Sequence, residues 1–205
     1  MDWLVVGLGN PGPEYEFTRH NLGFWAVDRV ARRLKRRFRQ GAGNFLVAEK
    51  SVGGQQLALA KPTTFMNLVG HAVTQLVDQY NITPSQLLVV CDDFALEEGR
   101  LRIRRRGSDG GHNGLKSIIN SLGMEEFARV RLGIGPVPEG IHPADFVLAE
   151  IGENAVNSLQ NLAERAAQAV VDCVVWGVEF AANAYNIRPS APTEDAGGAD
   201  RPKEV

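Results

Sequence analysis

The sequence contains few cysteines, no long uninterrupted hydrophobic segment and no strong net charge. Cys91 and Cys173 are the two cysteines among 205 residues. They exclude a disulfide scaffold and a cysteine-rich zinc site and suit a reducing compartment, so we expect a cytoplasmic protein. The most apolar late segment, 166–180, is interrupted by Asp172 and Glu179, so no membrane association is expected. With a formal net charge of −2, any nucleic-acid binding requires a local basic patch.

Signatures of several common enzyme classes are also missing. The chain contains neither the G-x-S-x-G turn of esterases nor the H-E-x-x-H motif of zinc proteases. Residues 7–12 (GLGNPG) match the glycine pattern of a dinucleotide-binding turn. That turn requires a helix to begin inside it, but Pro11 and Pro13 remove backbone donors and disfavour helical geometry just before them. We therefore expect no metal and no cofactor, with a nucleotide-dependent oxidoreductase as an alternative.

Strand and helix patterns alternate along most of the chain. Apolar or alternating segments predict strands at 3–8, 45–49, 57–60, 87–91, 100–106 and 128–134. Helical spacing predicts helices at 22–38, 67–80, 115–122 and 154–183. This order indicates an α/β fold in which a single domain, residues 1–188, contains a twisted mixed β-sheet flanked by helices. From 189 to 205 the composition shifts to Pro, Ala, Gly, Asp and Glu, which is typical of a disordered tail.

Polar residues with catalytic potential follow the predicted strands. Asn10, His20, Asn67 and Asp92 occupy such positions, and His112 and Asn113 lie in a glycine-rich loop. Sites in open α/β sheets form at the carboxyl ends of strands, so one pocket could collect them. A histidine paired with an aspartate can take a proton from water, and asparagine amides can stabilise an oxyanion. The set favours hydrolysis of an activated acyl bond without a covalent intermediate.

Each of these residues also has a structural explanation when it is considered alone. Asn67 could be a helix N-cap, and Asn10 could serve a turn. Cys91 lies in an apolar segment typical of a core. His71 and His142 are expected to be structural. Tyr15, Phe65 and Met66 could belong to the core or could contact a substrate.

A second group of residues is basic. Arg100, Arg102, Arg104 and Arg106 alternate with other residues, so on a strand they would line one face. Arg129 and Arg131 repeat the spacing later, and Lys116 lies near the glycine-rich loop. Such a stripe is typical either of a solvated face or of a contact surface for phosphate backbone.

Five motifs together carry a more specific signal. They resemble the successive signatures of bacterial peptidyl-tRNA hydrolases, in that family's order and spacing, over residues 3–185. The motifs are 6–12 (VGLGNPG) with Tyr15, 18–24 (TRHNLGF), 61–67 (KPTTFMN), 110–116 (GGHNGLK) and 131–135 (RLGIG).

The resemblance implies cleavage of the ester between peptide and tRNA in peptidyl-tRNA, by a protein that is usually monomeric and free of metal. It implies that His20 is the catalytic base, that Asp92 orients it, and that Asn113 acts with them. The implied substrate-binding residues are Asn10, Tyr15, Phe65, Met66, Asn67 and His112, the last at a loop position linked to tRNA handling. The implied tRNA contacts are Arg102, Arg104, Lys116 and Arg131.

The sequence departs from the family pattern around the central strand. Ala95 replaces a second acidic residue, Cys91 stands where some relatives have histidine, and Val69 stands where serine is common. A non-enzymatic RNA-binding relative, of the kind that this family has produced in plastid splicing, is the main alternative. Such a protein would keep the basic face and lose catalytic residues, whereas His20 and Asp92 are both present here.

Overall fold

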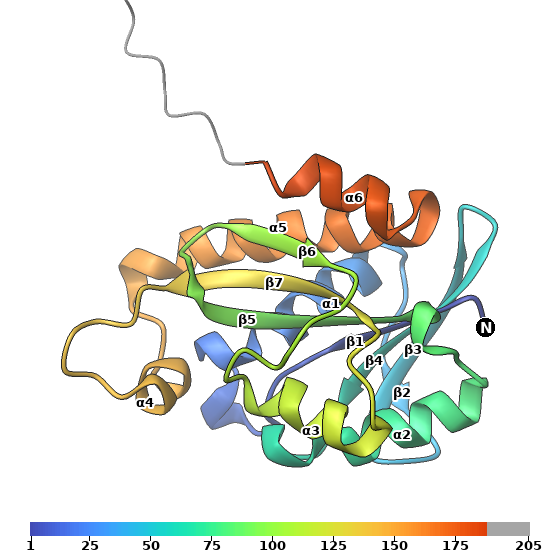
Figure 1. The fold of residues 1–205 in the computed structure, drawn as a ribbon, viewed down its shortest axis with the longest axis horizontal. Coiled ribbons are helices and arrows are strands. Elements are labelled where there is room, and N and C mark those ends of the chain that lie inside the picture. The colour runs from blue at the N-terminus through green and yellow to red at the C-terminus, as the bar shows by residue number, and fades with distance from the viewer. Residues whose placement is uncertain (188–205) are drawn as a thin grey trace, which may run out of the picture.

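A seven-stranded mixed sheet forms the centre of the protein in the computed structural model, which describes residues 1–187 (Figure 1). The expected disordered tail, 189–205, lies outside the described residues. The strand order is β2-β3-β4-β1-β5-β7-β6. The bounds are β1 Trp3–Gly7, β2 Arg39–Gln40, β3 Phe45–Val52, β4 Gln55–Pro62, β5 Leu87–Glu97, β6 Leu101–Arg104 and β7 Ala128–Gly135.

The middle of the sheet is parallel and its edges are antiparallel. Strand β1 pairs in parallel with β4 and β5, and β5 pairs in parallel with β7. Strand β3 runs antiparallel to both β2 and β4, and β6 runs antiparallel to β7. The α/β fold with a mixed sheet is therefore confirmed. The parallel strands are almost continuously apolar because both of their faces are covered.

Helices cover the two faces of the sheet. One core lies between the sheet and α1 (Leu22–Arg33), α5 (Glu153–Trp176) and α6 (Val178–Tyr185). A second core lies between the opposite face and α2 (Val69–Tyr80) and α3 (Asn113–Leu122) (Figure 1). Short helical turns occur at η1 Pro13–Tyr15, η2 Arg19–Asn21, η3 Met66–Leu68 and η4 Pro84–Gln86, and α4 is Pro143–Leu148. No helix among residues 1–187 is long and apolar enough to cross a membrane.

The glycine-rich turn after β1 allows a close approach of helix and strand. A Cβ atom at Gly23 would lie 2.4 Å from both the backbone nitrogen of Leu8 and the carbonyl oxygen of Val90. A Cβ atom at Gly7 would lie 2.4 Å from the carbonyl oxygen of Gly23. Helix α1 begins at Leu22, well beyond the 7–12 motif. The glycines thus fix α1, and the turn η2 before it, against the sheet.

Several predicted boundaries were wrong. The helix expected at 22–38 ends at Arg33. Lys35 has a φ of 54°, in the left-handed region, so the right-handed helix cannot continue through it. The helix expected at 154–183 is divided at Gly177, whose φ is 91°. The central strand continues to Glu97, so Asp92 lies within it. Arg100 and Arg106 fall outside β6. The short helix α4 was not predicted.

Candidate functional site

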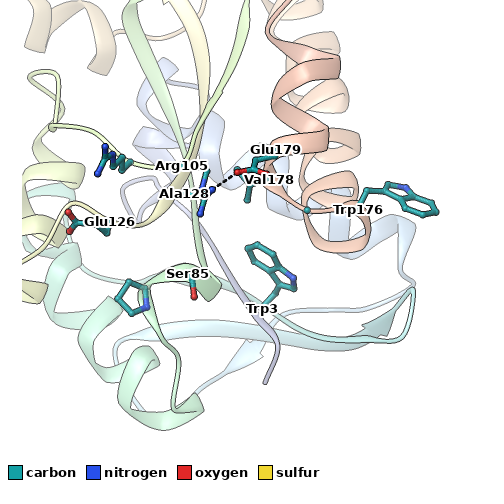
Figure 2. Close-up of a pocket in the computed structure, with 11 residues that line it drawn as sticks. Trp3, Ser85, Arg105, Glu126, Ala128, Trp176, Val178 and Glu179 are labelled. Atoms are coloured by element: carbon teal, nitrogen blue, oxygen red, sulfur yellow. Dashed lines mark hydrogen bonds and ion pairs between the residues drawn. The ribbon is translucent and has the colours of Figure 1, made fainter.

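Two separate hollows occur at opposite ends of the parallel strands. One, of about 940 Å³, lies at their amino ends and is lined by residues that include Trp3, Ser85 and Ala128 (Figure 2). Its charged groups include an ion pair between Arg105 and Glu179. The other, of about 640 Å³, lies at the carboxyl ends and contains a histidine–carboxylate pair. Because that pair can move a proton, the second hollow is the candidate site; we call it the site cavity.

The site cavity brings together most of the residues expected from the sequence. Its lining includes all nine predicted catalytic and substrate-binding residues: Asn10, Tyr15, His20, Phe65, Met66, Asn67, Asp92, His112 and Asn113. The rings of Tyr15 and Phe65 meet edge to face, with centroids 6.2 Å apart. Part of the wall comes from α4 and the residue before it, with Pro143, Val147 and Leu148. This part of the wall was not predicted from the sequence.

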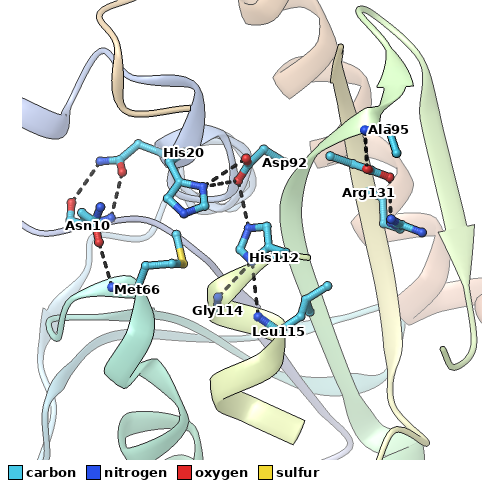
Figure 3. A network of polar contacts seen from close by, with 11 residues as sticks. Asn10, His20, Met66, Asp92, Ala95, His112, Gly114, Leu115 and Arg131 are labelled. Carbon is cyan, nitrogen blue, oxygen red and sulfur yellow. Dashed lines mark hydrogen bonds and ion pairs between the residues drawn. The ribbon is translucent and has the colours of Figure 1, made fainter. Parts of the chain in front are cut away.

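His20 and Asp92 form the polar centre of the cavity. His20 lies in η2 and Asp92 lies in β5, 72 residues further along the chain. Nδ1 of His20 is 3.0 Å from both carboxylate oxygens of Asp92 (Figure 3). The two residues are 7% and 2% exposed. The close packing of α1 on β1 and β5 brings them together, and their pairing leaves Nε2 of His20 as its unpaired ring nitrogen.

A second histidine binds the same carboxylate. Nδ1 of His112 accepts hydrogen bonds from the backbone N–H groups of Gly114 and Leu115, at 3.0 and 3.3 Å. A nitrogen that accepts two donors carries no proton, so the proton of a neutral ring is on Nε2. That nitrogen lies 3.0 Å from Oδ1 of Asp92 and donates to it (Figure 3). Asp92 therefore accepts from two imidazoles.

The electrostatics of this group favour a carboxylate beside a basic imidazole. Burial alone would raise the pKa of Asp92, but the charges and hydrogen bonds of His20 and His112 hold the pKa well below its usual range. Burial lowers the pKa of His20, and the charge and hydrogen bond of Asp92 outweigh that effect, so the net pKa is raised. Asp92 thus remains ionised and strengthens His20 as a base.

The same three residues are also close enough to be considered as metal ligands. The candidate atoms of His20, Asp92 and His112 lie within 4.8 Å of one another. However, the Nε2 atom of His112 carries a proton that is donated to Asp92, and Nδ1 of His20 is at hydrogen-bond distance from the same carboxylate. A metal would have to displace both hydrogen bonds. The donor set therefore fits a proton-transfer site better than a metal site.

An asparagine network holds the loops on the other side of the cavity. The side chain of Asn21 accepts from the backbone N–H of Asn10 at 2.8 Å and donates to its carbonyl oxygen at 3.0 Å. Oδ1 of Asn10 accepts from the backbone N–H of Met66 at 2.8 Å (Figure 3). This pattern leaves the amide N–H groups of Asn10 for a ligand. No role was predicted for Asn21 from the sequence. The signal that could have indicated one is the position of Asn21 directly after His20.

The basic residues divide into a surface group and a structural one. Arg102 and Arg104 lie opposite Arg131 and Arg129 in the register of β6 and β7. A groove of about 910 Å³ along this edge includes Arg102, Arg104 and Arg131 in its lining. Nε of Arg131 pairs with Asp93 at 2.7 Å. Lys116 is exposed in the first turn of α3.

Arg129 differs from its neighbours because it is buried. It is 1% exposed and donates to the carbonyl oxygens of Gly107, Ser108, Glu125 and Phe127. These contacts fasten the loop after β6 to the start of β7. The expectation that Arg129 continues a basic surface stripe was therefore wrong.

The fold and the site together define a class of protein. A histidine–carboxylate pair lies in a cavity at the carboxyl ends of parallel strands, beside amide groups, and this arrangement suits a hydrolase that activates water. A family model described as peptidyl-tRNA hydrolase matches residues 4–194. The chain belongs to this family, as the sequence resemblance predicted.

Individual relatives agree with the family model. The chain is 45% identical over 184 residues to the peptidyl-tRNA hydrolase of Chlorobium phaeobacteroides, and the aligned segment covers 89% of this chain and 97% of the relative. It is 46% identical over 185 residues to the peptidyl-tRNA hydrolase of Chloroflexus aurantiacus, and that alignment covers 90% of this chain and 98% of the relative. The crystal structure of peptidyl-tRNA hydrolase from Acinetobacter baumannii has a TM-score of 0.83 at 32% identity, covering 90% of this chain and 94% of that one.

Proposed function

We propose that this protein hydrolyses the ester bond between peptide and tRNA in peptidyl-tRNA and releases free tRNA for reuse in translation. The observation that carries the proposal is the His20–Asp92 pair inside a cavity lined by Asn10, Asn67 and Asn113. Family membership supports the same reaction. We also propose that the protein works in the cytoplasm, as a monomer and without a cofactor.

In the proposed reaction, His20 is the general base. Nδ1–H donates a hydrogen bond to the ionised Asp92, and Nε2 takes a proton from a water molecule in the cavity. The hydroxide adds to the ester carbonyl carbon, and a tetrahedral intermediate with a negative oxygen forms. The imidazolium of His20 then gives its proton to the departing ribose oxygen. The products are a tRNA with a free hydroxyl group and a peptide carboxylic acid, which releases its proton to solvent and becomes a carboxylate.

Asparagine amides are proposed to supply the remaining stabilisation. Asn113 begins α3 and Asn67 lies in η3, and both line the cavity. Their N–H groups can donate to the oxyanion or hold the water, and one such donor contributes roughly 10²–10³ in rate. Asn10 is proposed to donate to the peptide backbone. Substrates without a peptide amide would leave such a buried group unpaired, which disfavours ordinary aminoacyl-tRNA.

The walls of the cavity and the basic groove are proposed to bind the two halves of the substrate. Met66, Tyr15 and Phe65 would contact the peptide, because they line the cavity beside Asn10. For the tRNA, Arg102, Arg104, Lys116 and Arg131 would contact phosphates of the acceptor end. Because Arg131 is held by Asp93, its position would be fixed before tRNA binds.

Cleavage of N-acetylated aminoacyl-tRNA tests the proposal. Release of the N-acetyl amino acid should be abolished in His20→Ala while tRNA binding remains. An Arg102/Arg104 double alanine should weaken binding and flatten its salt dependence, because fewer counterions are released. His71→Gln is a matched control, since His71 is exposed on α2. If the wild-type protein binds tRNA but releases no acyl group, the non-enzymatic RNA-binding alternative is correct.

A further inference from the structure

His112 lines the site cavity, but neither of its ring nitrogens is available to a substrate. Nδ1 accepts from Gly114 and Leu115, and Nε2 donates to Asp92. The residue is 7% exposed. A polar contact to tRNA or peptide would require one of these hydrogen bonds to break, which costs free energy in a buried group. The contacts therefore favour a different role from the substrate contact implied by the sequence resemblance.

We propose that His112 is a positioning residue that holds Asp92 against His20 and ties this pair to the start of α3, where Asn113 begins. The inference rests on the proposed ester hydrolysis, because it concerns how the base and the oxyanion donor keep their relative positions. His112 would not touch the substrate's reacting atoms. It would act through Asp92 on one side and through the first turn of α3 on the other.

Two imidazoles determine the geometry around the carboxylate of Asp92. A carboxylate bound on one side by a single imidazole can rotate about its terminal torsion, which is broad for aspartate. Asp92 instead accepts from His20 at 3.0 Å and from His112 at 3.0 Å. The two rings are 4.8 Å apart between centroids and are tilted by 43°. Donors from two different chain segments fix the carboxylate plane and so fix the direction of Nε2 of His20.

The ring of His112 is itself held in place by the first turn of α3. Two N–H groups of the first turn of α3 point at its Nδ1, so the ring is the N-cap of this helix. A Cβ atom at Gly114 would lie 3.0 Å from Cε1 of His112 and 2.5 Å from Sδ of Met66. The ring is therefore packed as well as hydrogen-bonded. A shift of α3 would move His112, and with it Asp92.

The other titratable groups nearby do not replace this contact. On the same strand, Asp93 is paired with Arg131 of β7, and burial raises the pKa of the Cys91 thiol. Arg129 of β7 is committed to backbone carbonyls. His142, before α4, lines the same cavity and caps α4 through its Nδ1. Among the described residues, His20 and His112 are the histidines that bind Asp92.

Two substitutions separate the two contacts of His112. In His112→Asn, the amide oxygen can still cap α3 in place of Nδ1, but the side chain is too short to reach Asp92. In His112→Gln, the amide nitrogen can still donate to Asp92, but the cap is lost. His71→Gln on the exposed face of α2 is the control for loss of a histidine.

The first measurement is an NMR titration of the His20 ring in the full chain without substrate. The four histidines of the sequence are assigned by single substitutions. With one donor fewer, the carboxylate of Asp92 attracts the His20 proton more strongly, so the pKa of His20 rises in His112→Asn. It stays near the wild-type value in His112→Gln and in the control. An unchanged His20 titration in His112→Asn would overturn the inference.

The second measurement is steady-state cleavage of N-acetylated aminoacyl-tRNA between pH 5 and 9. We expect His112→Asn to lose about three- to tenfold in kcat/KM at pH 6, less at pH 8, with KM little changed. We expect His112→Gln to lower the melting temperature by about 2–4 °C while keeping the wild-type pH profile. Equal pH profiles in both variants would contradict a positioning role. Absence of cleavage by the wild type would refute the proposed function alone, because the titration needs no substrate.

Discussion

Replacement of Asp92 by asparagine is the sharpest test of the proposed base. The substitution keeps the size of the side chain and one oxygen acceptor but removes the negative charge. Asp92 receives N–H groups from His20 and His112, and an asparagine can accept through its oxygen alone. If the oxygen stays with His112, the amide N–H₂ faces Nδ1 of His20. His20 must then accept at Nδ1 and carry its proton on Nε2, so the base loses its free nitrogen.

The expected loss can be worked out from the distance. His20 becomes positively charged only as it takes the proton of water, so its attraction to the Asp92 charge acts in the transition state. Two unit charges 3.0 Å apart attract by about 5.5 kcal/mol at an effective dielectric constant of about 20. Each 1.36 kcal/mol corresponds to a factor of about ten in rate. We therefore expect the single-turnover rate constant of Asp92→Asn to fall by about 10⁴-fold.

The measurement is release of N-acetyl amino acid from N-acetylated aminoacyl-tRNA at pH 7 to 8 under single-turnover conditions, with the protein in saturating excess over the substrate. Asp93→Asn is the control, because Asp93 is a buried neighbour on the same strand that pairs with Arg131 rather than with His20. The control should keep its rate constant within a few-fold. A loss smaller than about tenfold in Asp92→Asn, with a folded protein, would refute the argument that this carboxylate stabilises the imidazolium.

Four further outcomes follow from the contacts described above. The pKa of His20 is raised above 6.5, so kcat/KM should fall on acidification with a midpoint above 6.5, and a midpoint below that value in a pH–rate profile would contradict the assignment. Asn21→Ala leaves two backbone groups of Asn10 unpaired, so urea unfolding should show a loss of about 2 kcal/mol together with a higher KM. Arg129→Ala should destabilise the fold by about 3 kcal/mol, because four carbonyl oxygens lose a buried donor. Arg104→Ala should instead leave stability within about 0.5 kcal/mol and reduce the salt slope of tRNA binding by about one; equal losses of stability in the two arginine variants would be inconsistent with these roles.

Local patterns predicted the elements that carry the site. Strand β1 and helix α1 follow from an apolar segment and from helical spacing, and α1 begins at Leu22 rather than inside the proline-containing 7–12 motif, as the prolines predicted. The end of α1 could not be predicted from spacing, because Leu34 and Phe38 continue the apolar pattern while Lys35 takes a left-handed conformation. At Gly177 a local signal did exist, since a glycine that follows an apolar stretch is a common helix end.

The roles of single residues depended on contacts that no local pattern contains. Arg129 and Arg131 have the same spacing and charge, yet one is buried under backbone carbonyls and the other pairs with Asp93 at a groove. Helix α4 has only six residues, too few for a periodic pattern, although it forms one wall of the cavity. The motifs could locate the site, but burial and pairing decided what each side chain does there.

The network around Asp92 explains why residues so far apart in sequence must be kept together. His20 precedes α1, Asp92 lies in β5, and His112 precedes α3, so the two histidines approach the carboxylate from helices on opposite faces of the sheet. Any change that shifts either helix alters the hydrogen bonds at the carboxylate. A Cβ atom at Gly23 would meet backbone atoms of Leu8, directly after β1, and of Val90 in β5, so even Gly23→Ala must displace α1. The effect of that substitution on ester cleavage should therefore exceed its effect on tRNA binding, because the phosphate contacts proposed for Arg102 and Arg104 on the edge strand do not depend on the position of α1.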